Sequence, residues 1–469
     1  MEGSFGYNDF EEHNAKRSAR EFEAMLETKA YHFIDLMKVD EIFGYYLQTN
    51  ELSKAQQLVD FAFKSYPGSS DLCFKQAKLD LELGRLPDAL HHIDDALELN
   101  PLYPEYLQFK ADLLARLDQY EEGIRMLEQL LIMTDRHEEV YLHMGNIAQI
   151  CGRSDASERF YRLALDLEPT FEEALFELAF LLESEEKLEA GIRVYESYLE
   201  LHPYSAEVWY NLSILYRRIG RFEKALEACD FAIVIKENFA SPHFHKGQIL
   251  MDLDRYREAI PHFLQAGSIH PKDIHTLYHT AECYEQVGIY RDAIRYYHKV
   301  TRLDPDYQDA WLGIGYSLEK QDRFLEAIHY YEKALSLDEE NSDLCLSLAI
   351  CEYKLGNKHS SYVYLERAIR LDPGDEGLWQ DWAQLLQESG NYLGAISYLE
   401  EGIQVNPSLS SLYYQCAAYC LKVSMIGKGL TYLENALILD YDNHYQLFHY
   451  DPSLEKQPQV RQIIQAFAL

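Results

Sequence analysis

Apolar residues recur along the chain with the spacing of an α-helix, in short stretches that a polar break separates. Residues 308–341 show this most clearly: Trp311 and Leu318 share one face of a first helix, and Ala327 and Tyr331 share one face of a second. Asp322 marks the break between the two helices. One such hairpin cannot bury its apolar face alone, so the pattern predicts that neighbouring copies stack into a continuous core.

The same pattern recurs every 34 residues between residues 36 and 443, which gives twelve units without an insertion. Two helices can approach closely only where the side chain between them is small. Position 8 is small in every unit except the first, where it is Phe43. Position 20 is small in all twelve: Ala55, Ala89, Gly123, Ser157, Gly191, Ala225, Ala259, Ala293, Ala327, Ser361, Ala395 and Gly429. These positions are therefore expected to face an adjoining helix.

Turn residues punctuate each unit at fixed places. Proline follows the second helix at position 32 in eight units, where it ends that helix. Glycine or aspartate, which tolerate the unusual backbone angles of a tight turn, often lies between the two helices. The residues at this break are Gly84, Asp118, Gly152, Gly220, Asp254, Gly288, Asp322, Gly356 and Gly390.

The pattern resembles the tetratricopeptide repeat (TPR). The matching residues in two of the units are Trp209, Leu212, Ser213, Tyr216, Ala225 and Ala232, and Leu277, Ala281, Tyr284, Ala293, Tyr297 and Pro305. The resemblance covers residues 36–443. It implies an all-α fold, a right-handed superhelical solenoid of stacked helix-turn-helix repeats, in a multi-repeat scaffold or adaptor of bacterial type.

The two ends of the chain depart from the repeat. Residues 1–35 are expected to form an acidic tail, over residues 1–12, and then a capping helix from about Ala15 to Ala30. Residues 36–443 are expected to form one solenoid. Residues 444–469 end in a short helix with Val460 and Ile464 on one side, which predicts a C-terminal cap. A docking helix for a partner is the alternative for this last segment.

Charge and hydropathy restrict the partners. The formal net charge of −35 disfavours nucleic acid and anionic membrane surfaces, and it favours a partner with basic and apolar residues. No apolar run is long enough to span a membrane, and the N-terminus has no signal-peptide pattern. We therefore expect a cytoplasmic protein whose eight cysteines are reduced and do not form a disulfide framework.

Catalytic signatures are not found in the sequence. It contains no glycine-rich phosphate loop, no GxSxG elbow and no HExxH motif, so we predict no enzyme activity and no cofactor. His275 and His279 have the i, i+4 spacing of a metal pair, and His243 and His245 lie one unit earlier. Because no third ligand is fixed beside them, no metal site is predicted.

The resemblance places positions 2, 5, 9, 12 and 13 of each first helix on the inner surface of the solenoid. Position 5 is largely aromatic across the central units, where a merely soluble surface would be polar. The candidate partner-binding residues in this concave groove are Phe176, Phe180, Tyr210, Ile214, Phe244, Tyr278, Leu312 and Tyr316. The alternative is that the rings at position 5 pack inside the core between units.

Position 2 is usually acidic, as in Glu173 and Glu207, and position 5 is almost never basic. This argues against the Lys and Asn clamp with which some relatives hold a C-terminal carboxylate. The predicted function is a non-enzymatic scaffold or adaptor that holds a segment of a partner protein in the groove. A structural protein that self-associates, and an accessory subunit of a larger enzyme complex, are the alternatives. Light scattering separates self-association from the adaptor.

Overall fold

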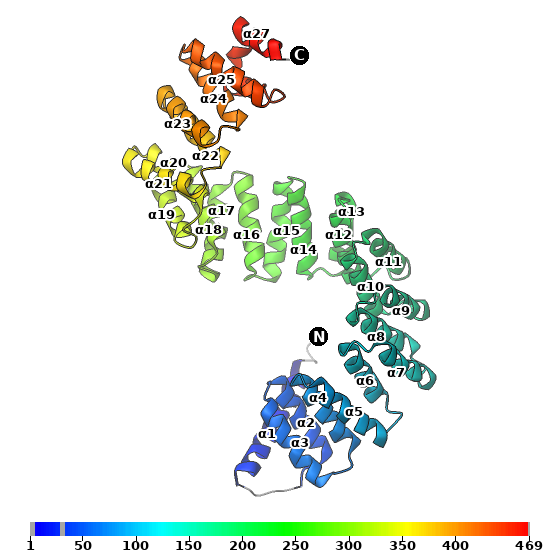
Figure 1. The fold of residues 1–469 in the computed structure, drawn as a ribbon. Helices are drawn as coiled ribbons and strands as arrows, with labels where there is room; N and C mark the ends of the chain where they lie inside the picture. The colour runs from blue at the N-terminus through cyan, green and yellow to red at the C-terminus, as the bar shows by residue number, and fades with distance from the viewer. Residues whose placement is uncertain (1–4, 29–32, 468–469) are drawn as a thin grey trace. The chain divides into compact units, whose positions relative to one another are not determined.

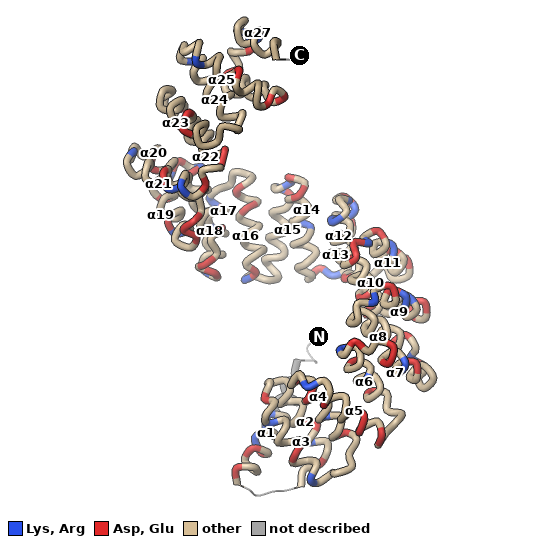
Figure 2. The backbone as a smooth tube through the Cα atoms, in the orientation of Figure 1, with Lys and Arg blue, Asp and Glu red and all other residues tan. Residues whose placement is uncertain are grey.

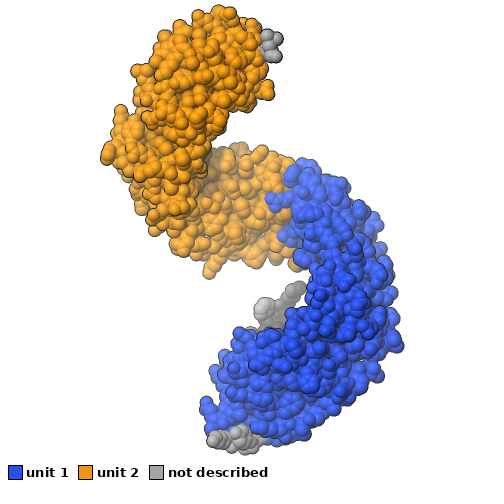
Figure 3. All heavy atoms as spheres, viewed as in Figure 1, with its two compact units in different colours: residues 1–228 blue, residues 229–469 orange. Residues whose placement is uncertain are grey.

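The computed structural model describes residues 5–28 and 33–467, and within these residues every regular element is a helix (Figure 1). The chain divides into two compact units, residues 1–228 and residues 229–469, which Figure 3 shows in different colours. Each unit is a series of antiparallel helix pairs, as the sequence pattern predicts. The predicted all-α fold of stacked helix-turn-helix repeats is confirmed.

Helix α1 (Phe5–Thr28) precedes the repeats of unit 1. The helix pairs of this unit are α2 (Leu36–Gln48) and α3 (Leu52–Ser65), α4 (Ser70–Glu82) and α5 (Leu86–Leu99), α6 (Pro104–Arg116) and α7 (Tyr120–Met133), α8 (His137–Ile150) and α9 (Ser154–Leu167), and α10 (Glu172–Ser184) and α11 (Leu188–Leu201). Then follow α12 (Ala206–Arg218) and α13 (Phe222–Ile235), whose span contains the boundary between the units.

Unit 2 continues the same alternation. Its pairs are α14 (Ala240–Asp252) and α15 (Tyr256–Ile269), α16 (Ile274–Gln286) and α17 (Tyr290–Leu303), α18 (Gln308–Glu319) and α19 (Phe324–Leu335), α20 (Ser342–Lys354) and α21 (Lys358–Leu371), α22 (Glu376–Glu388) and α23 (Tyr392–Val405), and α24 (Ser410–Lys422) and α25 (Ile426–Leu439). The unit ends with α26 (Gln446–Tyr450), the short 3₁₀ helix η1 (Pro452–Lys456) and α27 (Pro458–Phe467).

One residue in the turn of each pair has a left-handed backbone. These residues have φ between 56° and 85° and all lie at position 15 of their unit. They include every glycine and aspartate predicted at the break, together with Asn50, Glu186 and Ser424. The left-handed turn reverses the chain, and the amide of the next residue bonds back into the first helix, as from Arg323 to the carbonyl of Leu318 (3.0 Å).

The small residues at positions 8 and 20 lie in the core, as predicted. Ala89, Ala225, Ala327 and Ala395 are all fully buried. At position 8 of the first unit Phe43 is also buried, so this repeat accommodates a ring where the others have a small side chain. The close approach of the helices thus follows from side-chain size.

The N-terminal helix is longer than predicted. It begins at Phe5, well before the predicted start near Ala15, so residues 5–12 are helical and do not form an irregular tail. Residues 1–4 and 29–32 of the predicted N-terminal segment lie outside the described residues. Phe22 and Met25 are buried in one cluster with Val39 and Ile42 of α2.

The C-terminal segment packs onto the last repeat. Val460 and Ile464 of α27 are buried in the same cluster as Leu433 of α25. Asp451 is buried and lies 3.1 Å from Lys422 Nζ of α24. These contacts cover the end of the last helix pair. The division of the chain into a tail, one solenoid and a cap remains a prediction.

Candidate functional site

The candidate residues lie on the first helices of five consecutive repeats and are divided between the two units. Unit 1 carries Phe176 and Phe180 on α10, and Tyr210 and Ile214 on α12. Unit 2 carries Phe244 on α14, Tyr278 on α16, and Leu312 and Tyr316 on α18. The structure thus assembles two groups of four. In each group the position-9 aromatic is the most accessible: Phe180 is 61% exposed and Tyr316 is 37% exposed.

Three of the rings at position 5 are half-buried, and each packs against an aromatic ring of the second helix. The ring centroids of Phe176 and Tyr195 are 6.5 Å apart. The ring centroids of Phe244 and Phe263 are 5.5 Å apart. Those of Tyr278 and Tyr297 are 5.7 Å apart. Each ring therefore contributes to the packing between the paired helices and retains some exposed surface.

Three of the predicted residues enclose a hollow in unit 1. It has a volume of about 200 Å³, and its lining consists of Phe176, Phe180, Glu183, Tyr195, Asn211 and Ile214. The apolar groups come from α10 and α12, and Tyr195 rises from α11. Tyr210, the fourth predicted residue of this unit, does not line the hollow.

The polar groups of the hollow are held in place by neighbours. Glu183 Oε1 lies 2.6 Å from Arg218 Nη1 of α12, so its charge is balanced. Burial raises the pKa of Tyr195, and the carboxylate of Glu183 raises it further, whereas a hydrogen bond with Asn211 opposes them. The Tyr195 hydroxyl therefore stays protonated at neutral pH. The hollow offers an apolar surface beside an amide and a neutralised carboxylate.

The group in unit 2 is more acidic. Tyr278 lies 5.2 Å from Tyr307, ring centroid to centroid. Burial raises the pKa of Tyr278, and the carboxylates of Glu282 and Asp309 raise it further. Burial also raises the pKa of Glu285 to about 7. Aromatic rings and carboxylates thus lie together on this part of α16 and α18.

Tyrosines of the second helices reach toward the inner face through the gap that a small position 8 leaves. The Tyr331 hydroxyl donates to Glu319 Oε2 of α18 at 2.7 Å. Tyr161 donates to Gln149 Oε1 of α8 at 2.7 Å, and its oxygen lies 2.8 Å from Asn146 Oδ1. The acceptors Glu319 and Gln149 both lie at position 12 of their units. The side chain at this position is therefore held by a tyrosine hydroxyl from the second helix.

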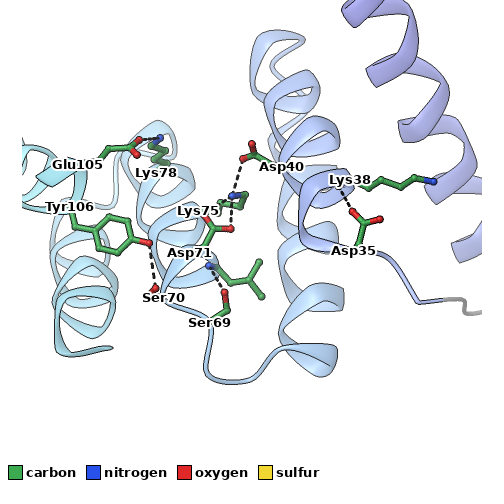
Figure 4. A network of polar contacts seen from close by, with 11 residues as sticks. Asp35, Lys38, Asp40, Ser69, Ser70, Asp71, Lys75, Lys78, Glu105 and Tyr106 are labelled. Atoms are coloured by element: carbon green, nitrogen blue, oxygen red, sulfur yellow. Dashed lines mark hydrogen bonds and ion pairs between the residues drawn. The ribbon is translucent and has the colours of Figure 1, made fainter. Parts of the chain in front are cut away.

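Ion pairs link the first helices of the first repeats of unit 1 (Figure 4). Lys75 of α4 is almost fully buried, and its Nζ lies 2.8 Å from Asp71 Oδ2 and 2.9 Å from Asp40 Oδ1 of α2. Lys78 bonds Glu105 of α6 at 3.1 Å. Each step from α2 to α6 is thereby bridged by opposite charges. Figure 2 shows that acidic and basic residues are spread over the helices of both units.

The histidines do not gather metal ligands. His275 is exposed, whereas the His279 ring lies 5.7 Å from the ring of Phe244 and its Nδ1 is 3.0 Å from Glu282 Oε2. Over the described part of the chain, no group of three or more His, Cys, Asp or Glu side chains is close enough to hold a metal ion. In residues 5–28 and 33–467, which the structure describes, no helix is long and apolar enough to cross a membrane.

Three residues that line the hollow were not among the predicted site residues: Glu183, Tyr195 and Asn211. Glu183 lies at position 12, which belongs to the expected inner surface. Tyr195 lies at position 24 of the second helix, which the inner-surface positions do not include. A search for polar residues at position 12 beside an aromatic at position 9 would have found Glu183.

Sequence profiles of the tetratricopeptide repeat match more than half of the chain, at residues 74–135, 138–171, 194–227, 240–273, 280–344 and 312–376. The matches at 138–171 and 240–273 have the same limits as the units derived from the small residues. The chain belongs to the tetratricopeptide-repeat family. Proteins of this family bind protein partners and are generally non-catalytic scaffolds, which supports the predicted interaction scaffold.

Several solved TPR structures are similar to parts of the chain. YrrB, a TPR protein with an unusual peptide-binding site, is 18% identical, covers 39% of this chain and 94% of its own, and has a TM-score of 0.36. A chain of the Cut9–Hcn1 hetero-tetramer of the APC/C is 13% identical, covers 93% of this chain and 97% of its own, and has a TM-score of 0.36. A TPR protein from Parabacteroides merdae is 17% identical, covers 54% of this chain and 98% of its own, and has a TM-score of 0.37. No curated protein matches the chain.

Proposed function

We propose that the protein is a non-enzymatic adaptor that holds a segment of a partner protein in a concave groove formed by the first helices. The observation that carries this proposal is the hollow of unit 1, which Phe176, Phe180 and Ile214 line. Phe180 is 61% exposed at the edge of this hollow, so its ring is accessible to a partner. A partner that covers this ring gains apolar contact without ordering a flexible side chain.

The hollow suits an apolar anchor residue of the partner. Its volume of about 200 Å³ accepts one side chain at a time, and its walls are mostly carbon. Asn211 at the edge supplies an amide that can bond the main chain beside the anchor. Because Arg218 neutralises Glu183, an apolar anchor is not repelled by an unpaired buried charge.

The group in unit 2 suits a basic residue of the partner. The rings of Tyr278 and Tyr307 attract a cation, and Glu282 and Asp309 add negative charge beside them. The net charge of −35 favours the same partner and repels nucleic acid. The proposed ligand is therefore a segment with apolar anchors and Lys or Arg residues.

Affinity purification of the full chain from its native cell, with mass spectrometry, tests this proposal. Phe180→Asp places a charge at the mouth of the hollow and is expected to remove partners that the unchanged chain retains. Ile132→Asp is the matched control, because Ile132 is 88% exposed on α7 of the same unit and does not line the hollow. Circular dichroism establishes that both variants keep their helices.

Retention of every partner by folded Phe180→Asp would rule out the hollow as the binding site. The captured partner then supplies a peptide for titration. Its affinity is expected to fall by at least about tenfold in Phe180→Asp and to change little in Ile132→Asp.

A further inference from the structure

A second and larger recess lies on the second helices of unit 1, away from the inner-face positions. It has a volume of about 470 Å³ and lies between α9 and α11, with Leu175 and Leu178 of α10 as its floor. Leu165 of α9 and Val194 of α11 form parts of the two walls. We call this recess the outer trough.

The α11 wall runs along most of its helix. Ala190, Val194, Ser197 and Leu201 follow one another at intervals of three or four residues, so they form a straight stripe of about 16 Å. Leu201 is 61% exposed at the end of this stripe. Helices α9 and α11 run in the same direction because two chain reversals separate them. The outer trough is therefore a channel between two parallel helices.

Opposite charges stand on opposite walls. Arg193 of α11 and Asp166 of α9 both line the trough and are both exposed. Among the described residues, neither side chain has an ion-pair or hydrogen-bond partner. Arg162, also in the lining, differs because Glu158 binds its guanidinium at 2.8 Å. The two walls thus present one available cation and one available anion to an occupant.

We propose that the outer trough docks an amphipathic α-helix of another protein, with an apolar stripe facing Val194, an acidic residue beside Arg193 and a basic residue beside Asp166. A helix lying between two parallel helices matches the length and shape of the channel. An extended segment finds no strand edge here, because both walls are helices whose main-chain amides and carbonyls are already bonded within each helix. The charges on the two walls fix the direction and rotation of the helix.

This proposal concerns the second helices and does not depend on the groove of the first helices. The probe is a display library of helical peptides of about 18 residues, roughly 27 Å long. Each peptide carries an apolar stripe, and its flanking positions are randomised among Glu, Lys, Ala and Gln. Selection uses the immobilised full chain at about 0.15 M ionic strength, where distant charges are screened.

Enriched peptides are expected to carry an acid on one side of the stripe and a base on the other. Selection on the double variant Asp166→Arg and Arg193→Glu is expected to enrich the inverted pattern. Both positions are exposed, so the variant tests the charges without disturbing the core. Exchange of either charge alone is expected to weaken an enriched peptide by about fivefold.

Two further variants locate the peptide. Val194→Asp is expected to weaken binding by at least about tenfold, whereas Phe180→Asp, in the hollow of the first helices, is expected to leave it unchanged. The proposal is overturned if no peptide is enriched, if the charge pattern does not invert, or if Val194→Asp binds as well as the unchanged chain. A dimer in light scattering that Val194→Asp dissociates would assign the trough to a second copy and equally overturn it.

Discussion

The ring of Tyr331 lies directly against the α-carbon of Gly315. A β-carbon at residue 315 would come within 2.5 Å of ring atoms Cδ1 and Cε1, which is closer than two carbon atoms can approach. Tyr331 is almost fully buried, and its hydroxyl donates to Glu319. The same relationship joins Gly145 to Tyr161. Glycine at position 8 is therefore the partner of a large ring at position 24.

Gly315→Ala is expected to destabilise the repeat formed by α18 and α19. The added methyl group forces the Tyr331 ring or its helix to move, at a cost of about 1–3 kcal/mol. Hydrogen exchange of the amides in these two helices measures the local effect, which a long repeat array does not report through a single unfolding midpoint.

Gly44→Ala is the matched control, because Gly44 lies inside α2 and a β-carbon there would meet nothing within 4 Å. Alanine should stabilise this helix by about 0.5–1 kcal/mol through its higher helix propensity. Equal effects of the two substitutions would show that propensity, and not the Tyr331 ring, determines the result at position 8.

Ser424→Gly is expected to stabilise the last helix pair. Ser424 is exposed in the turn between α24 and α25 and has a φ of 64°, a region that costs a residue with a β-carbon about 1 kcal/mol. Gly390→Ser makes the reverse change at the same turn position one repeat earlier, where φ is 82°, and should destabilise. Amide hydrogen exchange measures both effects. We expect slower exchange in α25 of Ser424→Gly and faster exchange in α23 of Gly390→Ser.

Lys75→Met is expected to change stability by less than about 1 kcal/mol. The Lys75 side chain is buried, whereas its partners Asp40 and Asp71 are 73% and 43% exposed, so the pairs are partly solvated and contribute little net stability once desolvation of the ammonium is included. Burial lowers the pKa of Lys75, and its bonds to Asp71 and Asp40 more than offset this, so the ammonium is charged. The double variant Asp40→Asn and Asp71→Asn leaves this charge without a counter-ion and should cost about 3 kcal/mol.

Hydrogen exchange of the amides in α2 and α4, measured for the two variants and the unchanged chain, separates these outcomes. A large loss of stability in Lys75→Met would show that the ion pairs of Lys75 with Asp71 and Asp40 stabilise unit 1 by more than the desolvation of the ammonium costs.

The fold could be predicted because one requirement recurs at a fixed interval. Ala89 and Ala327 are fully buried since two helices must approach at that place in every unit, and this shows in the sequence as a small residue every 34 positions. The turn is predictable for the same reason, except at Glu186 and Ser424, where a residue without special turn preference adopts the left-handed backbone.

The candidate site could be predicted only in part. Phe176 and Phe180 were found because the resemblance places positions 5 and 9 on the inner surface. Phe176 is less exposed than Phe180, and the ring of Tyr195 from the second helix packs against it. The ion pair between Glu183 and Arg218 likewise joins two repeats. Such contacts depend on side-chain conformations across several helices, which a pattern along one chain does not specify.

The stability of unit 2 is expected to fall between pH 4.5 and pH 7 because of Glu285. Burial raises the pKa of this carboxyl to about 7, although hydrogen bonds with Tyr297 and Ser317 oppose the shift. The unfolded chain loses the proton near its usual pKa, about 4.3, whereas the folded chain keeps it up to about pH 7. The folded state therefore binds more protons across this interval, and its stability declines as pH rises, by roughly 3–4 kcal/mol in all.

Glu285→Gln removes this titration and keeps a group of similar size. Amide exchange in α16 and α17 of this variant is expected to be slower than in the unchanged chain, by a larger factor at pH 8 than at pH 5, when both are measured at constant ionic strength and corrected for the intrinsic pH dependence of exchange. Glu282 contributes a repulsive charge and Lys320 an attractive one, so both are left unchanged in the comparison. A difference between the two proteins that is the same at both pH values would mean that the Glu285 carboxyl is already ionised at pH 5, and that the pocket around it is more polar than its burial indicates.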